Sequence, residues 1–338
     1  MKPSSSAPGV ALCGTCAMSC LAKLAAAPGA GRRTHELVAA ALRRVGSTSA
    51  STSSPAVPRG RIAGGRHESH HRRRPHPQQR RRLARTSAAA DVDTDAIIDS
   101  YLDDAQMDQV RTFATTLLEK NKVMNLTGAL TVDEVLGRHV ADSLALIPAI
   151  ERALDAGASS RHPGAKIRVM DVGSGAGFPG MALAIARPTW EVTLLDTLQK
   201  RTSFLAAAAA ECGADNVQTL WSRAEDAGKV GNREHREAYD VVTARAVAEL
   251  RVLAELCVPL VRVGGAFVAM KNSLASTAEE TDAAAGAIET LGGTPFVANE
   301  VKSVGPDGEL RTAVVSVKER ATPDKYPRRA GMPNKRPL

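Results

Sequence analysis

The sequence predicts an α/β protein whose doubly wound, mostly parallel sheet is preceded by a helical cap and closed at one edge by a β-hairpin. Three observations carry this prediction. Between residues 166 and 319, apolar runs of strand length alternate with segments of helical period. A glycine cluster follows the first run, Ile167–Val172, at the position where open parallel sheets bind ligands. The last two runs are separated by Gly305-Pro306-Asp307-Gly308, which is typical of a hairpin turn.

Length and composition are those of an ordinary globular protein. Its 338 residues, 43% apolar and 24% charged, are enough to bury a core and exclude collagen, coiled coils and wholesale disorder. The net charge of +8 is unevenly spread: residues 1–90 carry 16 Lys and Arg against 2 acids, and residues 91–338 carry 28 against 34. The overall basicity therefore does not indicate that the folded part binds nucleic acid. No apolar run reaches the roughly 18 residues of a membrane span, so we predict no membrane partner.

Residues 1–90 form a segment with a composition of its own. The segment consists mainly of Ala, Ser, Arg, Gly and Pro and nearly lacks acids, so it cannot bury a core. Arg-rich, Ser-rich and acid-poor N-termini are typical of organellar transit peptides. We therefore expect a disordered transit peptide that is removed on import. The alternative is a permanent basic arm that contacts RNA phosphates.

The cysteines predict neither a metal site nor a disulfide. Cys13, Cys16 and Cys20 form a C-x2-C-x3-C pattern, but no fourth ligand follows at matching spacing, so we interpret the pattern as chance. Cys212 and Cys257 lie in Ala- and Leu-rich helical segments, and we expect them to be small buried apolar residues.

A helical cap is expected over residues 91–164. Segments 95–120 and 131–155 carry apolar residues at helical spacing. Within the second segment, Arg138 and Asp142 stand at i and i+4, which places them on one helix face. The pattern alone favours a solvated ion pair that stabilises the helix by a few tenths of a kcal/mol.

The predicted sheet domain spans 165–320 and a basic tail follows over 321–338. Strands are expected at 167–172, 191–195, 217–221, 239–243 and 266–270, and hairpin strands at 294–301 and 311–317. Helices are expected at 181–186, 198–213, 247–261 and 278–291. Strands that alternate with helices in this way pair in parallel, because each helix returns the chain to the same edge of the sheet.

The glycine cluster is the sharpest functional signal. It reads Asp171-Val172-Gly173-Ser174-Gly175-Ala176-Gly177-Phe178-Pro179-Gly180. Glycines are needed where a ligand approaches the backbone or where a turn requires positive φ, and the cluster contains four of them. The spacing of Gly175, Gly177 and Gly180, with Asp196 about twenty residues farther on, also satisfies the dinucleotide fingerprint. NAD and S-adenosylmethionine are therefore both candidate ligands.

Two carboxylates flank the cluster, and one of them distinguishes the candidates. Asp171 precedes the loop, so its carboxylate suits a ligand that bears an ammonium and a sulfonium and repels a pyrophosphate. Asp196 ends the second strand, where its oxygens can accept the ribose hydroxyls of either ligand. Asp171 therefore favours S-adenosylmethionine over NAD.

Three later strand ends complete the expected crevice. Ala224 and Glu225 follow the third strand, where they can meet an adenine, and Arg245 and Lys271 follow the fourth and fifth strands. Side chains at the carboxyl ends of parallel strands face the ligand crevice. Each of these residues alone is more often a surface group, and their convergence is what suggests a site.

An ordered set of motifs resembles the bacterial RsmG (GidB) family from about Asp104 to Leu338. The motifs are Asn125-Leu126-Thr127, Arg138-His139-x-x-Asp142-Ser143, the loop 171–180, Leu195-Asp196-x-Leu198-x-Lys200-Arg201, Ser222-Arg223-Ala224-Glu225, Ala244-Arg245-Ala246, Lys325-Tyr326-Pro327-Arg328-Arg329 and Pro333-Asn334-Lys335. The resemblance implies a Rossmann-like class I S-adenosylmethionine-dependent methyltransferase fold. It also implies methylation of guanine N7 in 16S ribosomal RNA.

The resemblance assigns roles to particular residues. It implies that Gly173, Phe178, Asp196, Thr197, Leu198, Ala224, Glu225 and Arg245 contact the cofactor, in addition to Asp171, Gly175 and Gly177 of the loop. We expect Arg245, Lys271, Arg138 and Asp142 to form the catalytic set. Guanine N7 has an in-plane lone pair and carries no proton, so methyl transfer to it needs placement more than acid–base help.

The expected partner is 16S-type ribosomal RNA or the small ribosomal subunit, bound by a monomer. In the basic tail, Arg328, Arg329, Lys335 and Arg336 are expected to contact phosphates. The leader has no counterpart in the family, which suggests an organelle, the chloroplast or alternatively the mitochondrion. Two other functions stay open from sequence: an NAD-dependent oxidoreductase that uses the same glycine loop, and a non-catalytic ribosome-assembly factor that binds RNA.

Overall fold

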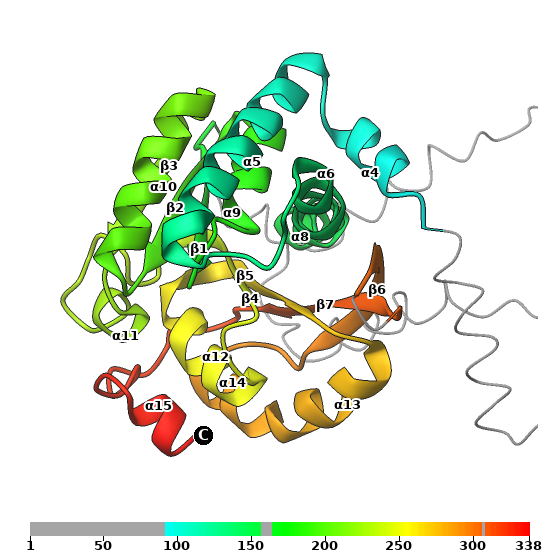
Figure 1. The fold of residues 1–338 in the computed structure, drawn as a ribbon. Helices are drawn as coiled ribbons and strands as arrows, with labels where there is room; N and C mark the ends of the chain where they lie inside the picture. The colour runs from blue at the N-terminus through cyan, green and yellow to red at the C-terminus, as the bar shows by residue number, and fades with distance from the viewer. Residues whose placement is uncertain (1–91, 157–163, 306–307) are drawn as a thin grey trace, which may run out of the picture. The chain divides into compact units, whose positions relative to one another are not determined.

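A computed structural model describes residues 92–156, 164–305 and 308–338 (Figure 1). The predicted transit peptide and Cys13, Cys16 and Cys20 lie outside the described residues, as does the centre of the predicted hairpin turn. Cys212 and Cys257 are buried free thiols, as predicted.

The described residues form a seven-stranded sheet in the order β3-β2-β1-β4-β5-β7-β6. The strands are β1 (Ile167–Val172), β2 (Trp190–Asp196), β3 (Val217–Trp221), β4 (Tyr239–Arg245), β5 (Val261–Lys271), β6 (Val297–Val304) and β7 (Leu310–Val317). Strands β1 to β5 are parallel, whereas β7 runs antiparallel to β5 and β6. The parallel sheet with a hairpin edge is confirmed. Its strand order reverses between β1 and β4, so a ligand crevice is expected at their carboxyl ends.

Helices cover both faces of the sheet (Figure 1). The cap contains α4 (Thr94–Tyr101), α5 (Asp104–Met124), α6 (Val132–Val135), a π-helical turn (Leu136–Val140), α7 (Ala141–Leu144) and α8 (Ile147–Ala156). The remaining helices are α9 (Gly180–Ala186), α10 (Gln199–Cys212), α11 (Ala224–Ala227), α12 (Leu250–Cys257), α13 (Leu274–Ala283), α14 (Ala285–Leu291) and α15 (Met332–Lys335). One hydrophobic core joins the cap, α9 and α10 to one face of the sheet, and a second core joins α12 and α14 to the other. The cap therefore shares its core with the sheet.

The first cap segment contains two helices, α4 and α5. Asp103 separates them: its side chain accepts a hydrogen bond from the Gln106 backbone N–H, and the Gln106 side chain accepts one from the Asp103 N–H. This reciprocal capping box starts a new helix despite the continuous apolar period. The helix ends at Asn125, whose φ of 51° reverses the chain.

The second cap segment is interrupted by the π-helical turn Leu136–Val140. Its Ala141 N–H donates to the Leu136 carbonyl, five residues back, so the turn holds one residue more than an α-helical turn. Arg138 is exposed while Asp142 is buried, and among the described residues no ion pair joins them. The predicted i, i+4 pair is therefore wrong, because the extra residue changes the angle between the two side chains.

Two boundaries near the end of the sheet also differ from prediction. The helix expected over 247–261 is shorter, since α12 ends at Cys257 and a 3-10 turn, Val258–Leu260, follows it. Strand β5 consequently starts five residues earlier than predicted. Gly264 and Gly265 lie inside it, where the register with β4 shifts, because glycines in a strand mark a bulge as well as a turn. The helix expected over 278–291 is divided into α13 and α14 at Ala284.

Lys318 follows β7 and stabilises the end of the sheet opposite the crevice. It is only 1% exposed, and its Nζ lies 2.7 Å from Glu237 Oε1. The same Nζ donates to the carbonyls of Val258 at 2.9 Å and Val261 at 2.8 Å. Burial lowers the pKa of Lys318 to about 8, so the side chain is still mainly protonated at neutral pH.

Replacing Lys318 by Met should lower the free energy of unfolding by about 2 kcal/mol, because Glu237 loses its cation in a partly buried place. Urea denaturation measures the change. The matched control is Lys302→Met on exposed β6, which should change stability by less than about 0.5 kcal/mol. Equal effects of the two substitutions would contradict the role given to the buried pair. Adding Glu237→Gln to Lys318→Met should restore part of the lost stability.

The C-terminal tail folds back on the domain instead of extending freely. The Arg328 guanidinium makes a bidentate ion pair with the fully buried carboxylate of Glu255, and its backbone N–H donates to the same carboxylate at 2.8 Å. The Gly331 N–H donates to Glu225 Oε1 at 2.9 Å. Arg328 was predicted to contact RNA phosphates, and the structure instead engages it with Glu255. Arg329, Lys335 and Arg336 are exposed.

Candidate functional site

The glycine loop between β1 and α9 has positive φ at three of its four glycines: 74° at Gly173, 56° at Gly175 and 101° at Gly177. Packing explains three of its glycines. A Cβ at Gly173 would lie 2.8 Å from the Val247 side chain. A Cβ at Gly177 would lie 2.9 Å from Leu205, Met181 and Phe113, and one at Gly180 would lie 2.2 Å from Leu194. A Cβ at Gly175 would instead meet only the Gly173 carbonyl oxygen, at 3.8 Å. Gly175 is therefore the point where a ligand can approach the backbone.

Asp171 lies beneath this loop and is completely buried. Its Oδ2 accepts a hydrogen bond from the Gly180 N–H at 3.1 Å, whereas its Oδ1 has no partner among the described residues. Burial raises the pKa of Asp171 to about 6, although the Gly180 N–H acts in the opposite direction. An unpaired buried carboxylate oxygen fits a ligand that brings a positive charge and disfavours a pyrophosphate.

Asp196 ties the glycine loop to the end of β2. Its Oδ2 accepts from the Gly175 N–H at 3.1 Å and its Oδ1 from the Leu198 N–H at 2.8 Å, and Arg201 lies 3.4 Å away. The carboxylate is only 3% exposed. It lies at the strand end predicted for a ribose acceptor, but it already holds two amides of its own chain, so one of its functions is to fix the loop.

Exposed apolar side chains surround the loop on the crevice side. Leu198 is 42% exposed, Trp221 58% and Val247 40%, and they follow or end β2, β3 and β4. The Trp221 indole donates to the Thr197 carbonyl at 3.0 Å, which fixes the ring beside the Asp196 segment. Such a surface suits the flat apolar face of an adenine. Trp221 and Val247 were not among the predicted site residues, although both are large apolar residues at strand ends.

The predicted adenine segment is placed differently from expectation in one respect. Ala224 is buried at the start of α11, directly after β3. The Glu225 carboxylate is 8% exposed and accepts from the Gly331 N–H of the C-terminal tail. Glu225 therefore anchors the tail next to the crevice.

Arg245 connects the loop, the cap and the end of β4. Its guanidinium lies 3.5 Å from Asp142 Oδ2 and 3.3 Å from His139 Nδ1. It also lies over the Phe178 ring, 5.5 Å from the centroid. Phe178 is 3% exposed and stacks on His139, with ring centroids 5.1 Å apart. The predicted loop contact Phe178 is thus a buried packing residue that holds Arg245 in place.

His139 is held in one tautomer. A guanidinium only donates hydrogen bonds, so Nδ1 accepts from Arg245 and the proton lies on Nε2. That nitrogen lies 2.7 Å from the Thr127 hydroxyl. Burial, with a smaller contribution from the Arg245 charge, lowers the pKa of His139 to about 4. The neutral ring therefore links the Asn125-Leu126-Thr127 motif to Arg245.

Asp142 is the buried anion of the same cluster. It accepts a hydrogen bond from the Ser303 hydroxyl, and Arg311 lies 3.7 Å from its Oδ2. Burial raises the pKa of Asp142, while Ser303 and the two arginines act against this. Ser303 and Arg311 belong to the hairpin and were not predicted, because no local pattern reveals a contact across more than 150 residues of chain.

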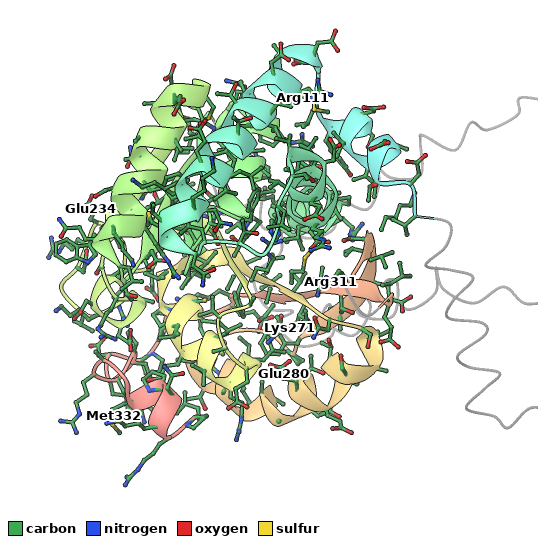
Figure 2. All side chains as sticks on the ribbon, viewed as in Figure 1. Arg111, Glu234, Lys271, Glu280, Arg311 and Met332 are labelled. Carbon is green, nitrogen blue, oxygen red and sulfur yellow. The ribbon has the colours of Figure 1, made fainter. Side chains whose placement is uncertain are left out.

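A pocket of about 760 Å³ opens beside this cluster, at the carboxyl ends of β4 and β5. All four predicted catalytic residues, Arg138, Asp142, Arg245 and Lys271, line it. Lys271 Nζ lies 2.7 Å from Glu280 Oε1 and donates to the Ala248 carbonyl at 2.9 Å. Figure 2 shows Lys271 and Glu280 next to one another above α13. The structure therefore brings the predicted residues together in one cavity.

Among the residues that the structure describes, no group of three His, Cys, Asp or Glu side chains has the geometry to hold a metal ion. None of the described helices is both long and apolar enough to cross a membrane.

The model of the family rRNA small subunit methyltransferase G (GidB) matches residues 106–303. The chain belongs to this family. The methyltransferase G of Symbiobacterium thermophilum is 46% identical over 226 residues, which cover 65% of this chain and 85% of that protein. The methyltransferase G of Pelotomaculum thermopropionicum is 42% identical over 233 residues, which cover 69% and 91%. The family predicted from the motifs and its Rossmann-like methyltransferase fold are confirmed.

Proposed function

We propose that this chain transfers the methyl group of S-adenosylmethionine to N7 of a guanine in small-subunit, 16S-type ribosomal RNA. The relatives it matches are named ribosomal RNA small subunit methyltransferase G. The observation that carries the proposal is the position of Arg245. It contacts Phe178 of the glycine loop and also lines the neighbouring pocket, so a methyl donor at the loop and a base in the pocket would lie next to each other.

The residues on the donor side select a cationic ligand. Asp171 offers one unpaired buried oxygen, and Gly175 gives access to the backbone. Leu198 and Trp221 supply an apolar surface for an adenine, and the neighbouring Asp196 carboxylate at the end of β2 is the acceptor for the ribose hydroxyls. S-adenosylmethionine supplies the methyl group as an electrophile when bound. NAD is disfavoured because its pyrophosphate would meet the carboxylate of Asp171.

The residues on the acceptor side place a base and stabilise charge. Guanine N7 presents its lone pair without losing a proton, so the site needs no general base. This agrees with His139, which is neutral and has both ring nitrogens engaged. Methyl transfer leaves a positive charge on the guanine. The negative charges of the buried carboxylates Asp142 and Asp171, both of which act on Arg245, offset it.

Mass spectrometry of small-subunit RNA tests the proposed reaction. Purified full-length chain, S-adenosylmethionine and unmethylated small subunits should yield 7-methylguanine at one position, with naked 16S-type RNA as the second substrate. Isothermal titration measures the affinities of the chain for S-adenosylmethionine and for NAD. Tighter binding of NAD would support the oxidoreductase, and RNA binding without methyl transfer would support the assembly factor.

We further propose that the enzyme acts in an organelle, with the chloroplast preferred over the mitochondrion, and that it acts as a monomer. The support for the location is the composition of residues 1–90, which is acid-poor and rich in Arg and Ser. Residues 1–90 fused to a fluorescent reporter should direct the reporter to plastids. A cytosolic signal would contradict the location, and light scattering of the purified chain tests the oligomeric state.

A further inference from the structure

The pocket contains an acid beside the end of β5. Glu280 projects from α13 and lines the pocket beside Lys271. Its Oε1 accepts from Lys271 Nζ and from the Leu250 N–H, both at 2.7 Å. Its Oε2 has no hydrogen-bond partner among the described residues, and the side chain is 26% exposed. A fixed carboxylate thus presents a free acceptor to the cavity.

The polar groups of the pocket follow one another in a definite order. Arg245, at the end of β4, contacts Phe178 of the glycine loop. Lys271 follows at the end of the next strand, and Glu280 lies beyond it. From the end of β4 to the end of β5 and on to α13, the pocket therefore presents Arg245, Lys271 and then the Glu280 carboxylate. The other carboxylate of the pocket, Asp142, is buried and paired with Arg245 and Arg311.

The edge of guanine carries its groups in the complementary order. N7 and O6 are acceptors, and the N1–H and 2-amino groups that follow are donors. If N7 faces the methyl donor, O6 meets the cations and the two N–H groups meet the carboxylate. Adenine has an amino group in place of O6 and an unprotonated N1, so it would oppose a donor with a donor and an acceptor with an acceptor.

We propose that this pocket binds the target guanine after it leaves the RNA stack, with Lys271 donating to O6 and the Glu280 carboxylate accepting from N1–H and the 2-amino group. The proposal rests on the proposed guanine-N7 methylation and adds the residue that reads the base. Enzymes that modify a base inside RNA or DNA extrude it into a pocket and read its Watson–Crick edge. The cavity of about 760 Å³ is within the usual range for a bound small molecule.

Inosine provides the test, because it differs from guanosine only in lacking the 2-amino group. The position methylated by the wild-type chain is first mapped. Small subunits are then reconstituted with RNA ligated to carry guanosine or inosine there, and N7 methylation is followed by mass spectrometry. The wild-type chain should prefer guanosine by about 10- to 100-fold in kcat/KM, since a hydrogen bond to a charged group is lost.

Two substitutions separate recognition of the base by Glu280 from a merely structural role of its side chain. They are Glu280→Gln and the control Glu279→Gln, at an exposed position of the same helix. Glutamine keeps an oxygen for Lys271 and Leu250 but loses the charge. The guanosine preference should fall below about 3-fold in Glu280→Gln and stay at the wild-type value in Glu279→Gln. An unchanged preference in Glu280→Gln, even at lower overall activity, would overturn the proposal. A wild-type chain that methylates no guanine would instead refute the proposed function itself.

Discussion

Replacing Asp171 by Asn should weaken the binding of S-adenosylmethionine by about 100-fold, because a hydrogen-bonded charge pair with the ligand is lost. The same substitution should stabilise the protein without ligand. The carboxylate is completely buried and one of its oxygens has no partner. Asn has the same shape and still offers an oxygen to the Gly180 N–H. The Asp171 carboxylate therefore destabilises the protein without ligand, and its contribution to ligand binding accounts for an acid at this position.

The pKa of Asp171 determines how protein stability and the binding of S-adenosylmethionine each change with pH. It rises from 3.8 to about 6 on folding, so the folded state binds the proton more tightly than the unfolded chain. The contribution of Asp171 to stability is therefore most favourable below pH 4 and is lost as the pH rises to about 6. The loss is roughly 3 kcal/mol at neutral pH. Binding of S-adenosylmethionine runs the other way and should weaken as the pH falls below about 6.

Isothermal titration at several pH values and thermal denaturation measure these effects on wild type and Asp171→Asn. The variant should bind weakly at every pH and show a higher Tm near pH 7. Asp215→Asn, at an exposed position before β3, is the matched control and should leave the affinity and the Tm unchanged. Normal affinity in Asp171→Asn would show that the carboxylate serves packing and not the ligand.

The glycine loop was predictable because its constraints are local. Positive φ angles at Gly173, Gly175 and Gly177 follow from neighbours in the sequence, and a parallel strand order places the loop at the crevice. The strand ends at Arg245 and Lys271 were predictable for the same reason. Their meeting in one pocket requires only that parallel strands end at a common edge.

The partners of these residues were not predictable, because they come from distant segments. Asp142 meets Ser303 and Arg311 only because α7 packs against the hairpin. The π-helical turn removes the i, i+4 relation on which its predicted pairing with Arg138 depended. Glu280 was not among the predicted site residues, although it lies in a segment predicted to be helical. Its place in the pocket depends on the packing of α13 near Lys271, which the spacing of residues in the sequence does not predict.

Arg245→Ala should lower kcat/KM for RNA methylation by about 1,000-fold, the upper range for removing a fixed cationic or hydrogen-bonding group at a reacting centre. The guanidinium holds His139 and Asp142 and rests on Phe178. Its loss removes a positive charge from the pocket. It also removes the contact that joins His139, and through it the Asn125-Leu126-Thr127 motif, to Arg245. Asp142 keeps Ser303 and Arg311, so we expect the fold to survive with a loss of about 2 kcal/mol.

Arg245→Lys distinguishes charge from shape. Lysine keeps the positive charge but is a single point donor, whereas the planar guanidinium bonds two partners at once and stacks on a ring. We therefore expect about 100-fold lower kcat/KM in this variant, with affinity for S-adenosylmethionine reduced much less than the rate. Transfer of a labelled methyl group to small subunits gives the rate, and isothermal titration gives the affinity. Arg152→Ala, at an exposed position of α8, should behave as wild type. A wild-type rate in Arg245→Ala would show that the base is not held in this pocket. Arg245 contacts the glycine loop and lines the pocket together with Lys271, so a base bound there would contact its side chain.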